Sequence, residues 1–160
     1  MSNQRDDKDR SPDFDFEIGE WTTQISRLVD PLTGSDTWVE YEGTSVVRPV
    51  WDGHANLGEL DVVGPDGTIQ GLSLRLYDPE ARQWRIHWAS SRDGQIGPAM
   101  VGGFEDGVGE FYNLEMFGGR ATFVRFVFSD ISATSFHLEQ AFSADGARTW
   151  EANWVAEFTR

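Results

Sequence analysis

The sequence of 160 residues contains no cysteine. A disulfide framework, a thiolate nucleophile and cysteine-ligated zinc are therefore all excluded. A chain of this length buries roughly 68–70% of the surface that its unfolded form exposes, which suffices for one domain core without cross-links. No run of 18 or more apolar residues occurs, so the sequence offers no candidate for a transmembrane helix.

Basic residues are also scarce. Lys and Arg number 13 against 27 Asp and Glu, which gives a formal net charge of -14. Nucleic acids and anionic membrane surfaces both require a basic face, so we expect neither as a partner. Aromatic residues make up 13% of the chain and include seven Trp, which argues for a folded protein despite the acidity. The first ten residues lack the apolar stretch of a signal peptide, and we expect the protein in the cytoplasm.

Turn signals divide the chain into short segments. Residues 1–12 form a charged stretch without periodicity, predicted to be a disordered tail, and residues 13–160 are predicted to form a single domain. Asp-Gly pairs, which favour hairpin turns, occur five times between segments of alternating hydrophobicity. The expected strands are 18–29, 36–49, 54–63, 68–77, 83–90, 96–104, 108–117, 120–129, 133–143 and 148–158.

These segments predict an all-β fold, since none shows a sustained helical period with caps. Ten antiparallel strands leave two exposed edges unless the sheet closes, which favours a closed up-and-down barrel of about ten strands. A two-sheet sandwich is the main alternative.

Alternation along the strands assigns one face of each to the interior. The inward sets are rich in large apolar side chains, with a few polar ones among them. They are Val39, Tyr41, Ser45 and Val47; Leu72, Leu74 and Leu76; Trp84, Ile86 and Trp88; Thr122, Val124, Phe126 and Phe128; Phe136, Leu138, Gln140 and Phe142; and Trp150, Ala152, Trp154, Ala156 and Phe158.

Such an interior suits a small-molecule cavity, although small barrels are also filled by their own side chains. We therefore expect a small hydrophobic or aromatic ligand, with a filled core as the alternative. Central tryptophans would form the walls, and a few polar groups would orient the ligand. The candidate ligand-binding residues are Tyr41, Trp84, Trp88, Gln140, Trp154 and Glu59.

Several motifs together resemble a bacterial family of uncharacterised lipocalin-like (calycin) barrels. The resemblance implies a closed antiparallel barrel with a central pocket, but no defined reaction. The sequence departs from the family at His54 and at Ile86, and Ile86 makes the interior more apolar. The motifs are Phe14-Asp15-Phe16-Glu17-Ile18-Gly19-Glu20-Trp21, Tyr77-Asp78-Pro79, Trp84-Arg85 with Trp88, Asp145-Gly146 to Thr149-Trp150, and Phe158-Thr159-Arg160.

Recognised catalytic and cofactor motifs are missing from the sequence. The three histidines lack metal-ligand spacing, so we expect no metal site. No nucleophile elbow or dinucleotide-binding glycine motif occurs, and we expect no cofactor. His54, near a predicted barrel mouth, is the one candidate for single-histidine haem ligation, and a surface turn histidine is the favoured interpretation.

Two other functions stay open. A barrel enzyme of the isomerase or cyclase type would need an ionisable group inside the cavity, and the positions to inspect are Glu59, Glu115, Tyr41 and Tyr77. For Glu59 and Glu115, a solvated outward position is the favoured interpretation. An interaction domain or homodimer would need an exposed apolar patch on the outer wall. Its candidate residues are Phe123, Val127, Tyr112 and Met116.

Overall fold

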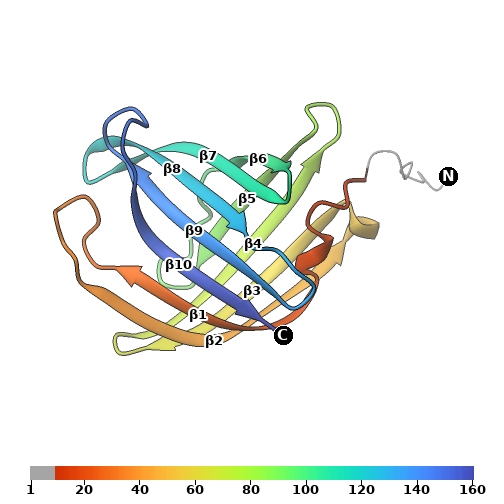
Figure 1. The fold of residues 1–160 in the computed structure, drawn as a ribbon, viewed down its shortest axis with the longest axis horizontal. Helices are drawn as coiled ribbons and strands as arrows, with labels where there is room; N and C mark the ends of the chain where they lie inside the picture. Colours follow the sequence, from red (N-terminus) through yellow and green to blue (C-terminus); the bar gives the residue numbers. More distant parts are fainter. Residues whose placement is uncertain (1–9) are drawn as a thin grey trace.

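The computed structural model describes residues 10–160. Its strands form one closed barrel in which each pairs antiparallel with its sequence neighbours and β1 closes onto β10 (Figure 1). The predicted all-β, closed up-and-down barrel of about ten strands is thereby confirmed. The strands are β1 (Gly19–Leu28), β2 (Trp38–Val50), β3 (Ala55–Gly64), β4 (Gly67–Asp78), β5 (Gln83–Ser90), β6 (Met100–Glu105), β7 (Val108–Phe117), β8 (Arg120–Ser129), β9 (Ser135–Ser143) and β10 (Glu151–Thr159).

Hairpin turns follow the predicted chemistry. Asp106 and Gly107 join β6 to β7 with φ values of 52° and 76°, and Gly118 and Gly119 join β7 to β8 at 57° and 79°. Two successive positive φ values are typical of the turn type that matches the twist of paired strands.

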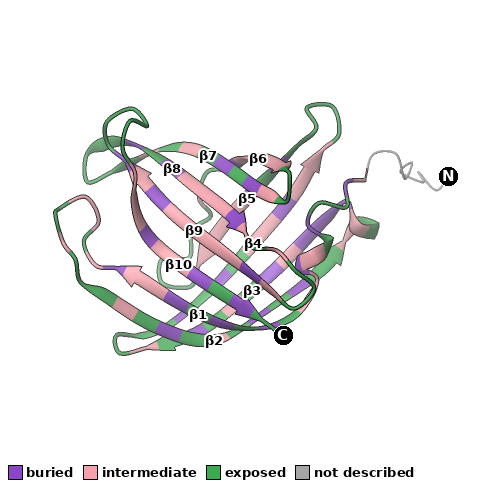
Figure 2. Cartoon of the chain, in the orientation of Figure 1, coloured by how far each residue is buried: buried purple, intermediate pink, exposed green. Residues whose placement is uncertain are grey.

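An N-terminal segment closes one end of the barrel (Figure 1). The short helix η2 (Asp15–Glu17) was not predicted. It places Phe14, which is 1% exposed, edge-on to Trp84 and Phe128 at ring-centre distances of 5.0 and 5.4 Å. Figure 2 shows buried residues along the adjoining strands. The main core therefore occupies this closed end.

The predicted tail lies largely outside the described residues. Of residues 1–12, the structure describes only the last three. Arg10 forms an ion pair with Asp15 at 2.6 Å, and Ser11 is buried. Within residues 10–160, none of the helices is long and apolar enough to cross a membrane.

The predicted inward face of β4 is wrong. Leu72 is 47% exposed, whereas Arg75 is 5% exposed and lies inside. Residues do alternate between two faces of β4, but the face that carries the leucines, predicted to point inward, points outward. Arg75 is tolerated inside because Glu17 of η2 supplies an opposite charge, which the local pattern of β4 does not reveal.

The predicted face of β10 is wrong at its start. A β-bulge lies between Ala152 and Trp154, and such a bulge reverses which residues point inward. Trp150 consequently lies on the outer wall, where the Arg125 guanidinium stands 4.4 Å from its ring centre. Phe158, beyond the bulge, keeps its predicted inward position, with a ring stacked 4.3 Å from that of Phe136.

Candidate ligand-binding cavity

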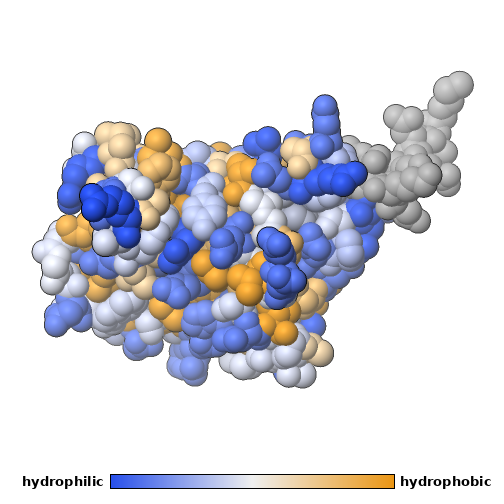
Figure 3. Space-filling model, turned by 45° about the horizontal axis from the view of Figure 1, so that its top comes forward, coloured by the Kyte–Doolittle hydropathy of each residue, from blue (hydrophilic) through white to orange (hydrophobic). Residues whose placement is uncertain are grey.

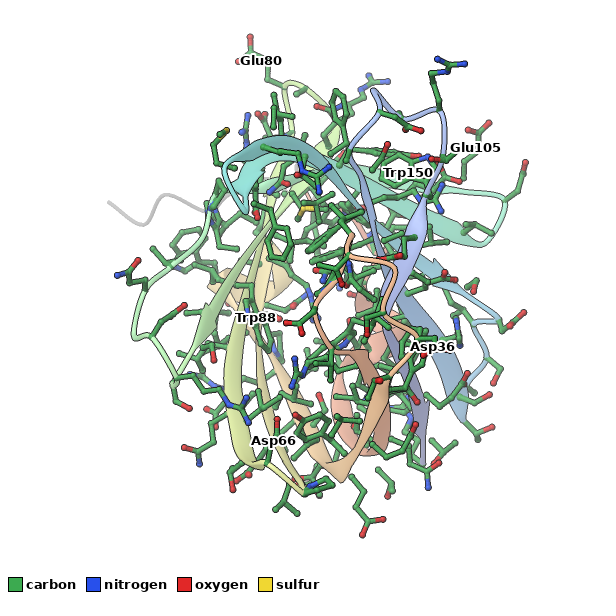
Figure 4. The ribbon with its side chains drawn as sticks, turned by 90° about the vertical axis from the view of Figure 1, so that its left-hand side faces the viewer. Asp36, Asp66, Glu80, Trp88, Glu105 and Trp150 are labelled. Atoms are coloured by element: carbon green, nitrogen blue, oxygen red, sulfur yellow. The ribbon has the colours of Figure 1, made fainter. Side chains whose placement is uncertain are left out.

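The barrel encloses a cavity of about 250 Å³ beyond the aromatic core. Figure 4 looks at the end opposite the N-terminal segment, and Trp88 lies toward the middle of this view, with Asp66 and Glu105 at its margin. The side chains around the cavity are mainly aromatic and aliphatic, with a few polar groups. The lining residues are Glu17, Ile25, Ser45, Gly58, Glu59, Leu60, Ser73, Arg75, Ile86, Trp88, Phe126, Phe128, Leu138, Gln140, Trp154 and Phe158.

A second cavity of about 340 Å³ adjoins the first. The two share four lining residues, namely Ile86, Trp88, Phe126 and Gln140. The second extends to the loop between β5 and β6, where residues 95–98 line it. Only three residue pairs join these strands in the ladder, so the barrel wall is least paired here. This second cavity is termed the mouth cavity.

Two tryptophans in contact with each other line the first cavity. The rings of Trp88 on β5 and Trp154 on β10 lie 6.5 Å apart in an edge-to-face arrangement. Gly71 on β4 makes the position of Trp88 possible, because a Cβ there would lie 1.9 Å from the indole Cη2 atom. The Trp88 ring therefore packs directly on the β4 backbone, and this packing requires glycine at position 71.

The floor of the first cavity is a buried ion pair. Arg75 Nη2 donates a hydrogen bond to Glu17 Oε1 at 3.0 Å, and Arg75 Nη1 donates to Asn56 Oδ1 at 3.1 Å. Arg75 Nη1 also stands 3.0 Å from Glu17 Oε2. Burial raises the pKa of the Glu17 carboxyl, and the Arg75 charge and hydrogen bond oppose that rise. The floor is thus polar but internally charge-balanced.

Three of the six predicted ligand-binding residues, Trp88, Gln140 and Trp154, line the first cavity with their inward faces. Glu59 borders it, but its cross-strand partners Val46 and Leu72 are exposed, which places the Glu59 carboxylate on the outer wall.

Two others lie elsewhere. Trp84 is packed into the core against Phe14 and lines neither cavity. Tyr41 is buried and donates its hydroxyl to Asp66, away from the cavity floor. The Tyr41 hydrogen bond lowers the pKa of Asp66.

Of the positions considered for enzyme chemistry, some line a cavity and others do not. Glu115 on β7 lines the mouth cavity, contrary to the outward position that the sequence favoured. Tyr77 packs against Trp84, with ring centres 5.2 Å apart, and lines neither cavity. His54, expected at the surface, is 7% exposed and pairs through Nδ1 with the Trp51 carbonyl. No group of three or more potential metal ligands converges within residues 10–160.

Sequence reasoning missed Glu17 and Arg75. A signal was present on β4, where the face of Arg75 also carries Gly71 and Ser73. Small residues beside a charged one indicate room for a neighbour's ring and for a partner charge. The partner itself lies 58 residues earlier in the chain, beyond the reach of a local pattern.

The outer wall carries an apolar patch over β7 and β8. Leu114 and Phe123 are cross-strand neighbours, exposed by 57% and 36%, and Met116 beside them is 71% exposed. Tyr112 is 41% exposed, while Val127 is half-buried. Figure 3 shows apolar groups interspersed with hydrophilic ones over the turned face. A homodimer through this patch stays a prediction.

Comparisons with known proteins find similar folds among solved structures. A scan against models of protein families finds no match, and a search of curated proteins finds none either. Among solved structures, the S-type phycobiliprotein lyase CPES from Guillardia theta aligns with a TM-score of 0.64 and 11% identity, over 96% of this chain and 94% of that one. The redesigned β-barrel mFAP1, bound to DFHBI, aligns with a TM-score of 0.50 and 10% identity, over 94% and 100%. The chain is a lipocalin-like, ten-stranded closed barrel.

Proposed function

We propose that this protein binds a small, largely apolar aromatic ligand inside the barrel. The observation that carries the proposal is the cavity of about 250 Å³ walled by Trp88 and Trp154. Ligand pockets typically combine such apolar walls with a few placed polar groups, which Ser45, Ser73 and Gln140 supply here. The similarity to mFAP1, a barrel bound to a small molecule, supports the proposal.

Titration with the neutral dye N-phenylnaphthylamine tests the proposal directly. We expect quenching of tryptophan fluorescence and a rise in dye emission, because the dye would stack beside Trp88 and Trp154. Binding should also raise the melting temperature with increasing dye concentration, since a ligand that binds only the folded state stabilises it. A panel of small aromatics without any response would overturn the proposal.

Filling part of the cavity should weaken this binding. Gly58 faces the cavity, and a Cβ there would meet its neighbours at ordinary distances of 3.4 Å or more. We therefore expect Gly58→Leu to fold and to weaken dye binding about tenfold or more, equivalent to roughly 1.4 kcal/mol. Dye titration and thermal melting of the purified variant measure both quantities.

The matched control is Gly103→Leu. Gly103 pairs with the exposed Glu110, so its added side chain would lie on the outer wall, where a Cβ meets nothing within 4 Å. This variant should bind the dye as the natural protein does. Equal loss of binding in both variants would place the dye outside the cavity.

A barrel enzyme of the isomerase or cyclase type is the second candidate, because Glu115 brings a carboxylate to the mouth cavity. Chromatography and NMR spectroscopy of ligands recovered after incubation separate the two functions. A binding protein returns its ligand unchanged, whereas an enzyme returns an isomer.

A further inference from the structure

The charges around the two cavities have one predominant sign. Among the described residues that line them, Arg75 is the only basic one, and its guanidinium is already paired with Glu17. The mouth cavity is lined by two carboxylates, Glu115 and Asp93. An anionic ligand would therefore enter past negative charges and find no unpaired cation inside, in a protein whose net charge is -14.

Glu115 is placed to meet a ligand. Its cross-strand partner is Thr122, which is fully buried, so this register position of β7 faces the interior. Glu115 Oε1 accepts a hydrogen bond from Asn113 Nδ2 at 2.9 Å, which orients the carboxylate and leaves its other oxygen as an acceptor. Trp88 and Phe142 line the same cavity, and aromatic faces attract cations as a carboxylate does.

Gln140 adds a second acceptor where the two cavities meet. Its Nε2 group donates to Asn153 Oδ1 at 2.7 Å. This hydrogen bond orients the amide and leaves the Gln140 Oε1 atom available to a ligand as an acceptor, beside the second N–H of Nε2. The Glu115 carboxylate requires a donor on the ligand, and Gln140 can accept a hydrogen bond from the same ligand.

We infer that the ligand carries a positively charged nitrogen beside its aromatic body, and that Glu115 binds this nitrogen at the mouth of the barrel. The inference rests on the proposed function, because it assigns a ligand class to the same cavity. The aromatic body occupies the first cavity and packs against the wall that Trp88 and Trp154 form, and the nitrogen meets the Glu115 carboxylate.

Three naphthalene probes of matched size test the ligand class. Naphthylmethylamine is cationic at neutral pH, naphthylmethanol is neutral, and naphthoate is anionic. Isothermal titration calorimetry should show the amine binding about tenfold more tightly than the alcohol, with the carboxylate weakest. Equal affinities, or tightest binding of the carboxylate, would overturn the inference while leaving the proposed function intact. No binding of any of the three would count against both.

Two variants test the role of Glu115. Glu115→Gln keeps the shape of the side chain but removes its charge, and it should reduce the affinity for the amine about tenfold while leaving that for the alcohol unchanged. Glu110→Gln removes the same charge from the exposed face of β7 and should leave both affinities unchanged. If both variants weaken amine binding equally, the net charge of the protein is responsible and Glu115 has no specific role. Thermal melting verifies that both variants fold.

Discussion

Replacing Arg75 with methionine should lower the free energy of unfolding by about 3–5 kcal/mol at neutral pH, because removal of one partner leaves a buried charge uncompensated. The side chains of Arg75 and Glu17 are only 6% and 3% exposed, so water cannot replace the lost partner. The same change leaves Asn56 without its hydrogen-bond donor. Urea denaturation monitored by circular dichroism measures this loss.

The destabilisation of Arg75→Met should shrink as the pH falls. Burial already raises the pKa of Glu17, and Arg75 is what opposes the rise, so its removal moves the folded-state pKa further above the unfolded value. The folded protein then binds more protons than the unfolded chain between those two pKa values, and stability declines as pH rises through that window. Below the unfolded pKa, Glu17 is neutral in both states and the penalty is smallest.

The double variant Glu17→Met with Arg75→Met is the control for this interpretation. It removes both charges and keeps apolar volume in the site, and replacement of a whole buried pair by apolar side chains is often close to neutral. We expect it to be more stable than Arg75→Met alone and to lose the added pH dependence. A double variant as unstable as the single one at every pH would show that packing, and not charge, explains the effect.

Gly71→Ala should dislodge the Trp88 wall of the cavity. The new Cβ would lie 1.9 Å from the indole Cη2 atom, so the ring must leave its position. Overpacking of this kind costs about 1–3 kcal/mol of stability. We expect a change in near-ultraviolet circular dichroism together with a loss of N-phenylnaphthylamine binding of about tenfold or more, since one wall of the site moves.

Gly103→Ala separates this effect from the general effect of a methyl group on a barrel strand. A Cβ at Gly103 meets nothing within 4 Å, so this variant should keep the aromatic spectrum and the dye affinity. If Gly71→Ala retained both the spectrum and the affinity of the natural protein, Trp88 would not be part of the binding site.

Much of the fold could be predicted because β-strands and hairpin turns have characteristic patterns in the local sequence. Alternation and the Asp-Gly turns located all ten strands, and the need to pair the sheet edges favoured closure. Trp88, Gln140 and Trp154 were correctly predicted on inward faces, because apolar and polar residues alternate along their strands. The faces of β4 and the start of β10 were wrong because a distant partner charge and a β-bulge decided them.

The sequence by itself determined the barrel and most of its inner surface, because strand periodicity is a property of neighbouring residues. Only the tertiary structure decided that a cavity remains within it. Whether side chains fill a barrel depends on how residues from distant strands meet, as Gly71 meets Trp88 and Glu17 meets Arg75. Glu115 was predicted to point outward and points inward in the structure for the same reason. Its surroundings come from β5, β8 and β9, and no local pattern on β7 describes them.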